Sequence, residues 1–216
     1  TPIASSAASD VYKRQSMFSV PLIHYEIANW HIAKKKIKEA LPDIQESMLE
    51  SNGQVYTDFF DEELKYKLPD WSDVVIDIIT PYLQDFTGKT RVEFTDMWFQ
   101  TALKGMSHGC HNHGASGWSS VIYLDYDEKV HLPTKFYSPF GNPWNGKLED
   151  YLPPVKEGDM VIFPSHITHE AEDNTSDVPR TIISYNMRGK TDIVKRTLWD
   201  DEGDPKIIIR EYREDC

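Results

Sequence analysis

The chain has 216 residues, of which 39% are hydrophobic and 12% aromatic, so it can bury a core in one domain and is unlike a disordered chain. Its formal net charge of −12 argues against non-specific binding to nucleic acid or to an anionic membrane, because phosphate groups attract basic surfaces. No apolar run approaches the roughly 18 residues of a membrane span, and the two cysteines form no disulfide framework, which favours a cytoplasmic location.

Residues 1–15 are small and polar and show no periodicity. The stretch from Ser5 to Gln15 resembles translated adaptor sequence, so we expect a non-native or disordered leader. A flexible recognition arm is the competing interpretation. The remainder, residues 16–216, is expected to form a single domain.

Helices are expected in the first part of the domain, after a short strand at residues 20–26. Asn29 can cap a helix that ends at Pro42, with apolar residues at roughly helical spacing between them. Residues 69–86 carry a broad apolar stripe and predict a second helix, which Pro81 is expected to break or kink.

The pattern changes after residue 90. Five segments are rich in β-branched and aromatic residues and are separated by Gly, Pro, Asn and Asp; they are residues 91–104, 118–126, 135–140, 159–164 and 180–187. Strands at short spacing without intervening helices predict an antiparallel sandwich or barrel. The expected fold is therefore mainly β with N-terminal helices, and its β core spans about residues 90–190.

Two further segments leave alternatives open. Residues 140–146 are rich in turn formers and could be a lid over a site or an ordinary connection between strands. The charged tail, residues 195–216, could be an edge strand or a subunit contact, so a homo-oligomer is an open expectation.

Three histidines, His108, His111 and His113, lie within six residues. Side chains alternate along an extended strand, so His111 and His113 are expected on one face. Two neutral imidazoles on one face can share a metal ion, whereas two imidazolium cations would repel each other. A third ligand must then come from another strand.

The best candidate for that ligand is His169, which follows the turn Glu157-Gly-Asp, a buried strand and a second turn at Pro164-Ser165. His166 competes with it but lies close to the turn. The other histidines, His24, His31 and His131, have no comparable context and are expected to be ordinary.

Arg180 begins an otherwise apolar strand, on the face that also carries Ile182, Ser184 and Asn186. A buried guanidinium requires an anion, and its planar fork matches a carboxylate. An Asp or Glu of this acidic chain could supply that carboxylate, and so could a bound ligand. Trp98 and Gln100 share another strand face that could line a cavity.

The histidine pair, the distal histidine after Gly-Asp-x-x-x-Phe-Pro-Ser and the following arginine together resemble the 2-oxoglutarate- and Fe(II)-dependent oxygenases. More specifically, His111-Asn-His-Gly-Ala-Ser-Gly-Trp and Arg180-x-x-x-Ser-Tyr-Asn look like those of an uncharacterised group from marine bacteria and phages. The resemblance covers about residues 94–190 and implies a double-stranded β-helix (jelly-roll) core.

The resemblance also implies an activity: a dioxygenase that uses Fe(II), 2-oxoglutarate and O2, with hydroxylation of a small molecule or a side chain as the default outcome. His111 and His169 would bind the iron. Arg180 would bind the distal carboxylate of 2-oxoglutarate, with further hydrogen bonds from Ser184 and Tyr123.

Two positions depart from the pattern of most relatives. His113 stands where they carry Asp or Glu, so it is either a third iron ligand or a neighbour of the iron site. Ile182 stands where many carry Ser or Thr, which weakens the assignment of the carboxylate contact.

Two competing site types follow from the same residues. The spacings from Gly105 to His113 and from Gly158 to His169 also resemble a three-histidine cupin metalloenzyme that needs no 2-oxoglutarate. A non-catalytic module with a structural zinc ion is the other alternative, for which His108 or Cys110 would supply the fourth ligand.

Overall fold

The computed structural model describes residues 19–50, 54–64, 67–88, 90–189, 193–199 and 205–212, the last two ranges as backbone only. The leader predicted at residues 1–15 lies outside the described residues, and the domain boundary after it stays a prediction. Neither helix in the described part has the length and the apolar character needed to cross a membrane.

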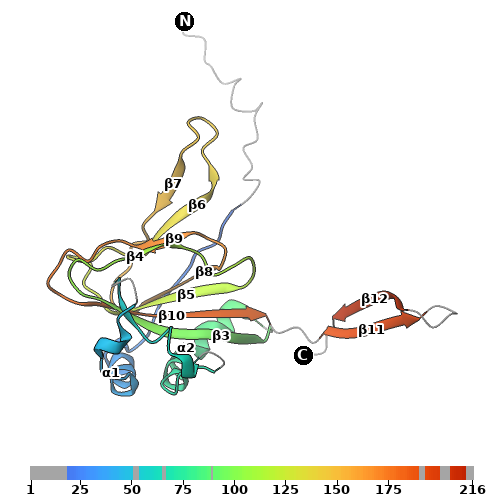
Figure 1. Cartoon of the computed structure of the whole chain (residues 1–216), viewed down its shortest axis with the longest axis horizontal. Helices are drawn as coiled ribbons and strands as arrows, with labels where there is room; N and C mark the ends of the chain where they lie inside the picture. The colour runs from blue at the N-terminus through green and yellow to red at the C-terminus, as the bar shows by residue number, and fades with distance from the viewer. Residues whose placement is uncertain are drawn as a thin grey trace, which may run out of the picture.

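Two antiparallel sheets lie one above the other and form a jelly-roll (Figure 1). The larger sheet has the strand order β1 (Ile23–Glu26), β8 (Asp159–Pro164), β5 (Trp118–Asp125), β10 (Arg180–Gly189), β3 (Val92–Ala102) and β2 (Tyr56–Thr57). The smaller sheet has the order β4 (His108–His111), β9 (His169–Ala171), β6 (Lys135–Gly141) and β7 (Leu148–Tyr151). The predicted fold class, mainly β with N-terminal helices, is confirmed.

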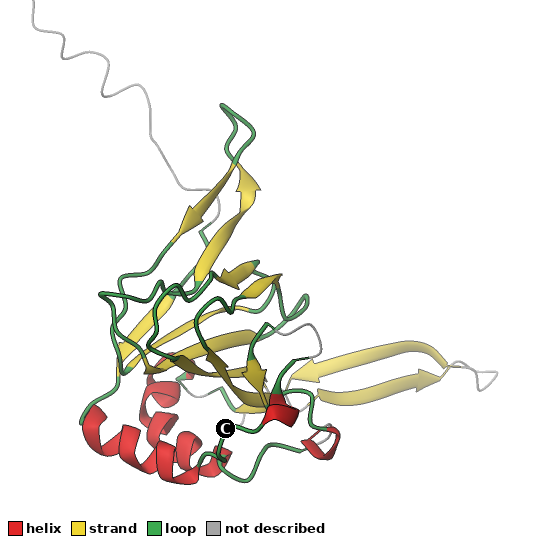
Figure 2. Ribbon diagram, turned by 60° about the vertical axis from the view of Figure 1, so that its left-hand side comes forward, coloured by secondary structure: helices red, strands yellow, loops and turns green. Residues whose placement is uncertain are grey.

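Two helices cover the outer face of the larger sheet, α1 (Trp30–Ala40) and α2 (Ser72–Thr87), as Figure 2 shows. Two 3₁₀ turns, η1 (Glu46–Met48) and η2 (Glu62–Leu64), flank the short strand β2. Successive side chains of β10 point to opposite faces of the sheet. Ile183 and Tyr185 pack toward the helices, and Ile182 packs into the interior between the sheets.

Helix α2 runs through Pro81 without the break that was one of the two expected outcomes. Proline lacks the N–H that would bond to the carbonyl of Asp77, four residues earlier. Both residues are exposed, so water can donate a hydrogen bond to that carbonyl. The buried face of the helix keeps its apolar side chains in the core, among them Val75, Ile79 and Leu83.

The connection at residues 140–146 is the turn of the β6–β7 hairpin, so the interpretation as an ordinary strand connection holds. This hairpin projects beyond the sheets (Figure 1). In the charged tail, β11 (Ile193–Trp199) and β12 (Pro205–Tyr212) pair with each other in a separate two-stranded sheet and are not an edge of either large sheet.

Candidate metal centre

Three histidine side chains converge at one end of the smaller sheet. His111 is the last residue of β4 and pairs in register with His169, the first residue of β9. Together with His113, each offers a ring nitrogen, and these atoms all lie within 4.8 Å of one another. Strand pairing between β4 and β9 therefore brings together residues that are far apart in the sequence.

His113 reaches this cluster by a route that strand alternation does not describe. Strand β4 ends at His111, so His113 follows the strand and is not part of it, contrary to the expectation of one extended segment. Its backbone N–H donates to the carbonyl of Ser165 at 2.8 Å, which ties it to the turn after β8. That turn precedes β9, and the bond therefore holds His113 near His169.

The tautomers of two of these histidines follow from their backbone partners. Nδ1 of His111 lies 2.7 Å from the carbonyl of Gly109, and Nδ1 of His169 lies 2.9 Å from the carbonyl of Ile167. A carbonyl only accepts, so both Nδ1 atoms carry the proton and both Nε2 atoms keep a lone pair. Metal-binding histidines typically make this bond with their second ring nitrogen. The two lone pairs thus suit a shared cation.

Distance and charge state fit a metal ion as well. The Nε2 atoms of His113 and His169 are 3.3 Å apart. Two nitrogens at about 2.1 Å from one ion are separated by about 3.0 Å at a right angle and by about 3.4 Å at the tetrahedral angle. Burial, followed by the neighbouring histidines, lowers the pKa of His113 to about 4 and that of His169 to about 3, so both rings are neutral at physiological pH.

The other candidate ligands stay outside the cluster. His108 lies beside His111 with ring centroids 4.2 Å apart, but its Nδ1 faces the side-chain amide of Gln100 at 2.9 Å. The thiol of Cys110 donates to Glu170 at 3.3 Å, and His166 is exposed. Within the described residues, the set within 4.8 Å has three members, which leaves coordination positions open and does not match a closed structural zinc site.

Arg180 lies on the inner face of the larger sheet, where only 5% of its surface is exposed. Its guanidinium donates to the carbonyls of Leu132 and Glu172, each at 3.0 Å. No carboxylate of the described residues lies within 4.0 Å of it, so the internal ion pair considered above is not formed there. Its hydrogen bonds go to neutral carbonyls, and Asp173 and Glu172 act on it only from beyond ion-pair distance, so the charge of this buried guanidinium is only partly compensated.

Ser184 and Tyr123 also lie inside the barrel, with 5% and 1% of their surfaces exposed. The hydroxyl of Tyr123 accepts the backbone N–H of Thr134 at 3.2 Å and also interacts with the side chain of Thr134. Ser184, Thr134, Ile182, His111 and His169 are among the residues that line a small inner cavity of about 20 Å³. Ile182 stands between Arg180 and Ser184 on the strand, so a dicarboxylate that joins them must displace this side chain.

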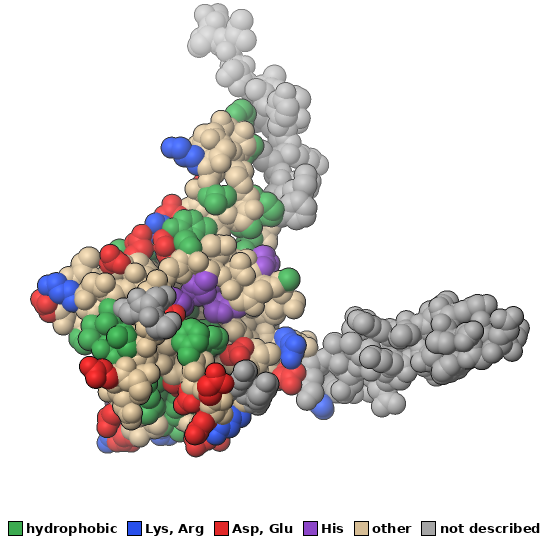
Figure 3. Space-filling model, viewed as in Figure 1, with side chains coloured by type: hydrophobic (Ala, Val, Ile, Leu, Met, Phe, Trp, Pro, Cys, Tyr) green, Lys and Arg blue, Asp and Glu red, His purple; other side chains and the backbone are tan. Residues whose placement is uncertain are grey.

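A second cavity opens in front of the histidines and has a volume of about 180 Å³. His111 and His113 line its floor, and Phe59, Phe60 and Trp98 line its walls. In Figure 3, histidine side chains lie in a hollow of the surface between hydrophobic side chains. Trp98 and Gln100 line this cavity as well as the inner one, as the shared strand face suggested.

Sequence reasoning missed the contribution of residues 50–60, which supply Glu50 and the phenylalanine pair to the front cavity. The only available signal was two adjacent aromatic residues in a polar segment.

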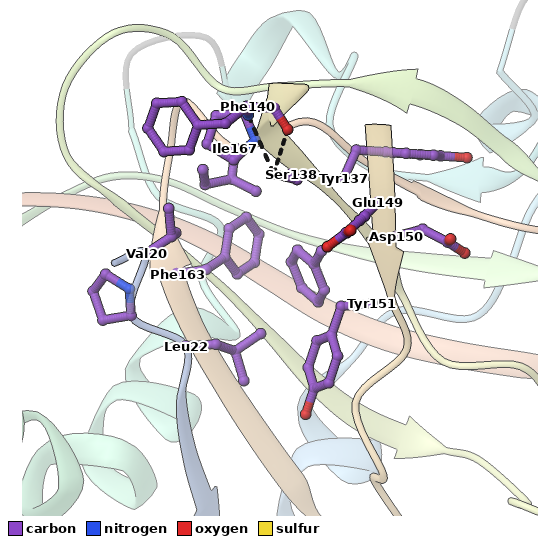
Figure 4. Close-up of a pocket in the computed structure, with 13 residues that line it drawn as sticks. Val20, Leu22, Tyr137, Ser138, Phe140, Glu149, Asp150, Tyr151, Phe163 and Ile167 are labelled. Carbon is purple, nitrogen blue, oxygen red and sulfur yellow. Dashed lines mark hydrogen bonds between the residues drawn. The ribbon is translucent and has the colours of Figure 1, made fainter. Parts of the chain in front are cut away.

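A different cavity, about 600 Å³ in volume, lies at the base of the β6–β7 hairpin (Figure 4). Phe136 and Phe163 line it and also contact the ring of His169, so they form the wall between that cavity and the metal cluster.

Comparison with known proteins gives one family. Residues 96–186 match a family described as "Putative 2OG-Fe(II) oxygenase". This stretch contains all three clustered histidines and Arg180. No curated protein matches the chain.

Solved structures of similar fold belong to the same class. An oxidoreductase of the 2OG-Fe(II) oxygenase family from Burkholderia pseudomallei has a TM-score of 0.56 at 15% identity, over 77% of this chain and 84% of that chain. The non-heme α-ketoglutarate-dependent epimerase SnoN has a TM-score of 0.57 at 12% identity, over 79% and 77%. The viral collagen prolyl hydroxylase of Paramecium bursaria Chlorella virus-1 has a TM-score of 0.51 at 13% identity, over 78% and 96%.

At these identities the structural similarity establishes the fold. The family match points to the activity of these oxygenases, and the cluster offers three imidazole nitrogens, which suit iron among other metals. Over residues 96–186 the chain is therefore similar to the putative 2OG-Fe(II) oxygenases, and its jelly-roll fold and three-histidine cluster agree with that similarity.

Proposed function

We propose that the protein hydroxylates an organic substrate at an iron centre held by His111, His113 and His169. In this proposal, Arg180 binds the distal carboxylate of 2-oxoglutarate, and Ser184 and Tyr123 add hydrogen bonds to the co-substrate. One oxygen atom of O2 enters succinate, which forms as 2-oxoglutarate loses CO2, and the other enters the product.

The observation that carries the proposal is the buried guanidinium of Arg180, which forms no ion pair with a carboxylate of the described residues on the inner face of the barrel. Its strand leads through Ile182 to Ser184, which lines the same inner cavity as His111 and His169. An anion between Arg180 and the histidines would neutralise the guanidinium and reach the metal site. A dicarboxylate of the length of 2-oxoglutarate meets both requirements once Ile182 has moved.

The chain's own residues position the reactants. Hydrogen bonds from Nδ1 to backbone carbonyls hold His111 and His169 with Nε2 directed into the cluster. When bound, Fe(II) supplies the activation of O2, a chemistry that side chains lack. The two cavities meet at His111, so the co-substrate can enter from the inner side and the substrate from the front.

Succinate formation tests the proposal. Protein reconstituted anaerobically with Fe(II) is mixed with 2-oxoglutarate and then exposed to O2, and 2-oxoglutarate binding is measured separately by calorimetry. We expect Arg180→Ala to lower 2-oxoglutarate affinity about 10- to 100-fold, the equivalent of a charge-assisted bond pair. Arg188→Ala is the matched control, because Arg188 lies on the same strand but 63% of its side chain is exposed.

Two outcomes of this experiment are decisive. If 2-oxoglutarate binds and succinate forms only in wild type and in the Arg188 control, the role of Arg180 is established. Iron that binds without any 2-oxoglutarate binding, in wild type and Arg180→Ala alike, would contradict the proposal and favour a cupin-type reaction without the keto acid. The separate measurement of 2-oxoglutarate binding distinguishes this outcome from an enzyme that binds the keto acid but turns it over slowly in the absence of its substrate.

We further propose a cytoplasmic enzyme. Cys110, the cysteine in the described part, is exposed and free, and an exposed thiol persists most readily in a reducing compartment.

A further inference from the structure

One polar group in the front cavity has no part in the reaction proposed above. Glu50 lines this cavity together with His111 and His113. Its backbone N–H donates to the carbonyl of Val55 at 2.9 Å, which anchors the residue at the cavity rim. Its side chain is partly buried, and Oε2 is a buried atom without a hydrogen-bond partner. A buried carboxylate oxygen without a donor is costly, so this atom can gain free energy from a ligand that supplies one.

A continuous aromatic wall faces the same space. The ring of Trp98 lies 5.4 Å from that of His113, the ring of Phe59 lies 4.9 Å from Trp98, and the ring of Phe60 lies 5.1 Å from Phe59. Phe59 and Phe60 remain 45% and 61% exposed, although they are large apolar side chains. Aromatic faces in this position can bind an apolar stem and attract a cation.

Among the described residues, neither Lys nor Arg lines the front cavity. A second cavity of about 680 Å³ shares Glu50, Thr57 and Phe60 with it, and its described lining adds the acidic residues Asp58 and Asp61. Lys67 lies at a separate cavity, which it lines with Asp58 and Phe59. Burial also raises the pKa of Glu50, because removal from water disfavours the charged carboxylate. The approach to the histidines is therefore negative and has aromatic walls.

We infer that Glu50 is a specificity-determining residue that binds a cationic nitrogen group of the substrate, an ammonium or a guanidinium, while the aromatic wall holds the adjoining carbon chain in front of the histidines. This inference rests on the proposed function and names its substrate class: organic cations whose reacting C–H lies a short apolar stem away from the charge. A neutral hydroxyl could also satisfy Oε2, but the aromatic faces and the described lining of the front cavity, which holds an acidic and no basic side chain, favour a cation.

Matched pairs of small probes test the inference. Butylammonium is compared with 1-butanol, and butylguanidinium with butylurea, by ligand-detected NMR titration of the full chain loaded with Zn(II). The variant Glu50→Gln keeps the size of the side chain and removes its charge. The control is Glu46→Gln, because Glu46 lies four residues earlier and is exposed. Removing an unpaired buried charge should not impair folding, which thermal unfolding would verify.

In wild type and in the Glu46 control, we expect each cation to bind about tenfold or more tightly than its neutral partner, and Glu50→Gln should reduce this preference to near parity. A second variant, Phe60→Ala, should weaken cation binding about two- to fivefold. Phe140→Ala should not, because Phe140 is similarly exposed but lines the cavity at the base of the β6–β7 hairpin.

Three results would overturn the inference: no binding of either cation, a cation preference that survives Glu50→Gln, or an equal loss for cations and neutral partners. Binding of 2-oxoglutarate to the same variants separates this inference from the proposed function. Glu50→Gln should leave that binding unchanged. If 2-oxoglutarate does not bind while the cation preference is present, the proposed function fails and the cation site remains.

Discussion

His113 and His169 approach each other with 3.3 Å between their Nε2 atoms, although 56 positions separate them in the chain. His169 directs a lone pair at this contact, since its Nδ1 proton is bound to the carbonyl of Ile167. The arrangement costs free energy unless a proton or a metal ion lies between the rings.

Removal of His169 should strongly weaken specific metal binding. We expect His169→Ala to weaken Co(II) or Fe(II) binding by more than tenfold, because one of three protein ligands is lost. His166→Ala serves as control, since His166 is exposed and only three residues away. Metal content after anaerobic reconstitution and gel filtration is the measurement. Equal loss in both variants would point to a folding defect and not to a ligand role.

A carboxylate at position 113 should be tolerated. His113→Asp creates the two-histidine, one-carboxylate set that most relatives carry, so we expect metal affinity to stay within about tenfold of wild type. His113→Ala should lose considerably more metal affinity than His113→Asp. The two affinities are compared by competition with a chelator. If His113→Ala binds metal as well as wild type does, His113 is a neighbour of the site and not a ligand.

Gly158 should not tolerate a side chain. It has a φ of 89°, and a Cβ atom would lie 2.6 Å from Cγ of Trp30. The left-handed backbone costs about 1–2 kcal/mol for a residue with Cβ, and the clash adds about 1–3 kcal/mol. Gly158→Ala should therefore lower the free energy of unfolding by about 2–5 kcal/mol. Gly105→Ala isolates the backbone contribution, because Gly105 has a φ of 79° and open space around it. A similar loss of unfolding free energy in both variants would show that Gly158→Ala relieves the clash with Trp30.

Asp58 should make stability depend on pH. Its carboxylate accepts N–H bonds from Trp71 at 2.9 Å and from Phe99 at 3.0 Å, yet burial dominates and raises its pKa above 3.8. The folded state then holds the proton to higher pH than the unfolded state does. This stabilising contribution is complete below pH 3.8 and is lost as the pH rises through the raised pKa of the folded state.

Asp58→Asn cannot titrate and provides the reference for this effect. We expect the free energy of unfolding of wild type to fall relative to Asp58→Asn as the pH is raised from below 4 to neutral, where the difference levels off. Urea unfolding of both proteins at a series of pH values measures it. A difference that moves in the opposite direction would mean that the two N–H bonds outweigh burial.

Local patterns were sufficient for most of the secondary structure. The two helices and the strands β3, β5, β6, β8 and β10 follow from apolar spacing and turn residues, which depend on neighbours within a few positions. Strand β7 and the short elements around Tyr56 were not anticipated, because their exposed or polar residues carry little pattern. Pro81 stayed inside its helix, since solvent on that face replaces the missing hydrogen bond.

The sequence by itself determined the chemistry that is available: the donor histidines, an arginine on an apolar strand and the family pattern that links them. Only the tertiary structure decided which residues meet. It brought His169 beside His111 through the pairing of β4 and β9, left His108 and Cys110 outside the cluster, and placed Glu50 and the phenylalanines at the front cavity. These contacts join distant segments, and long-range pairing depends on the packing of whole sheets, which no local pattern encodes.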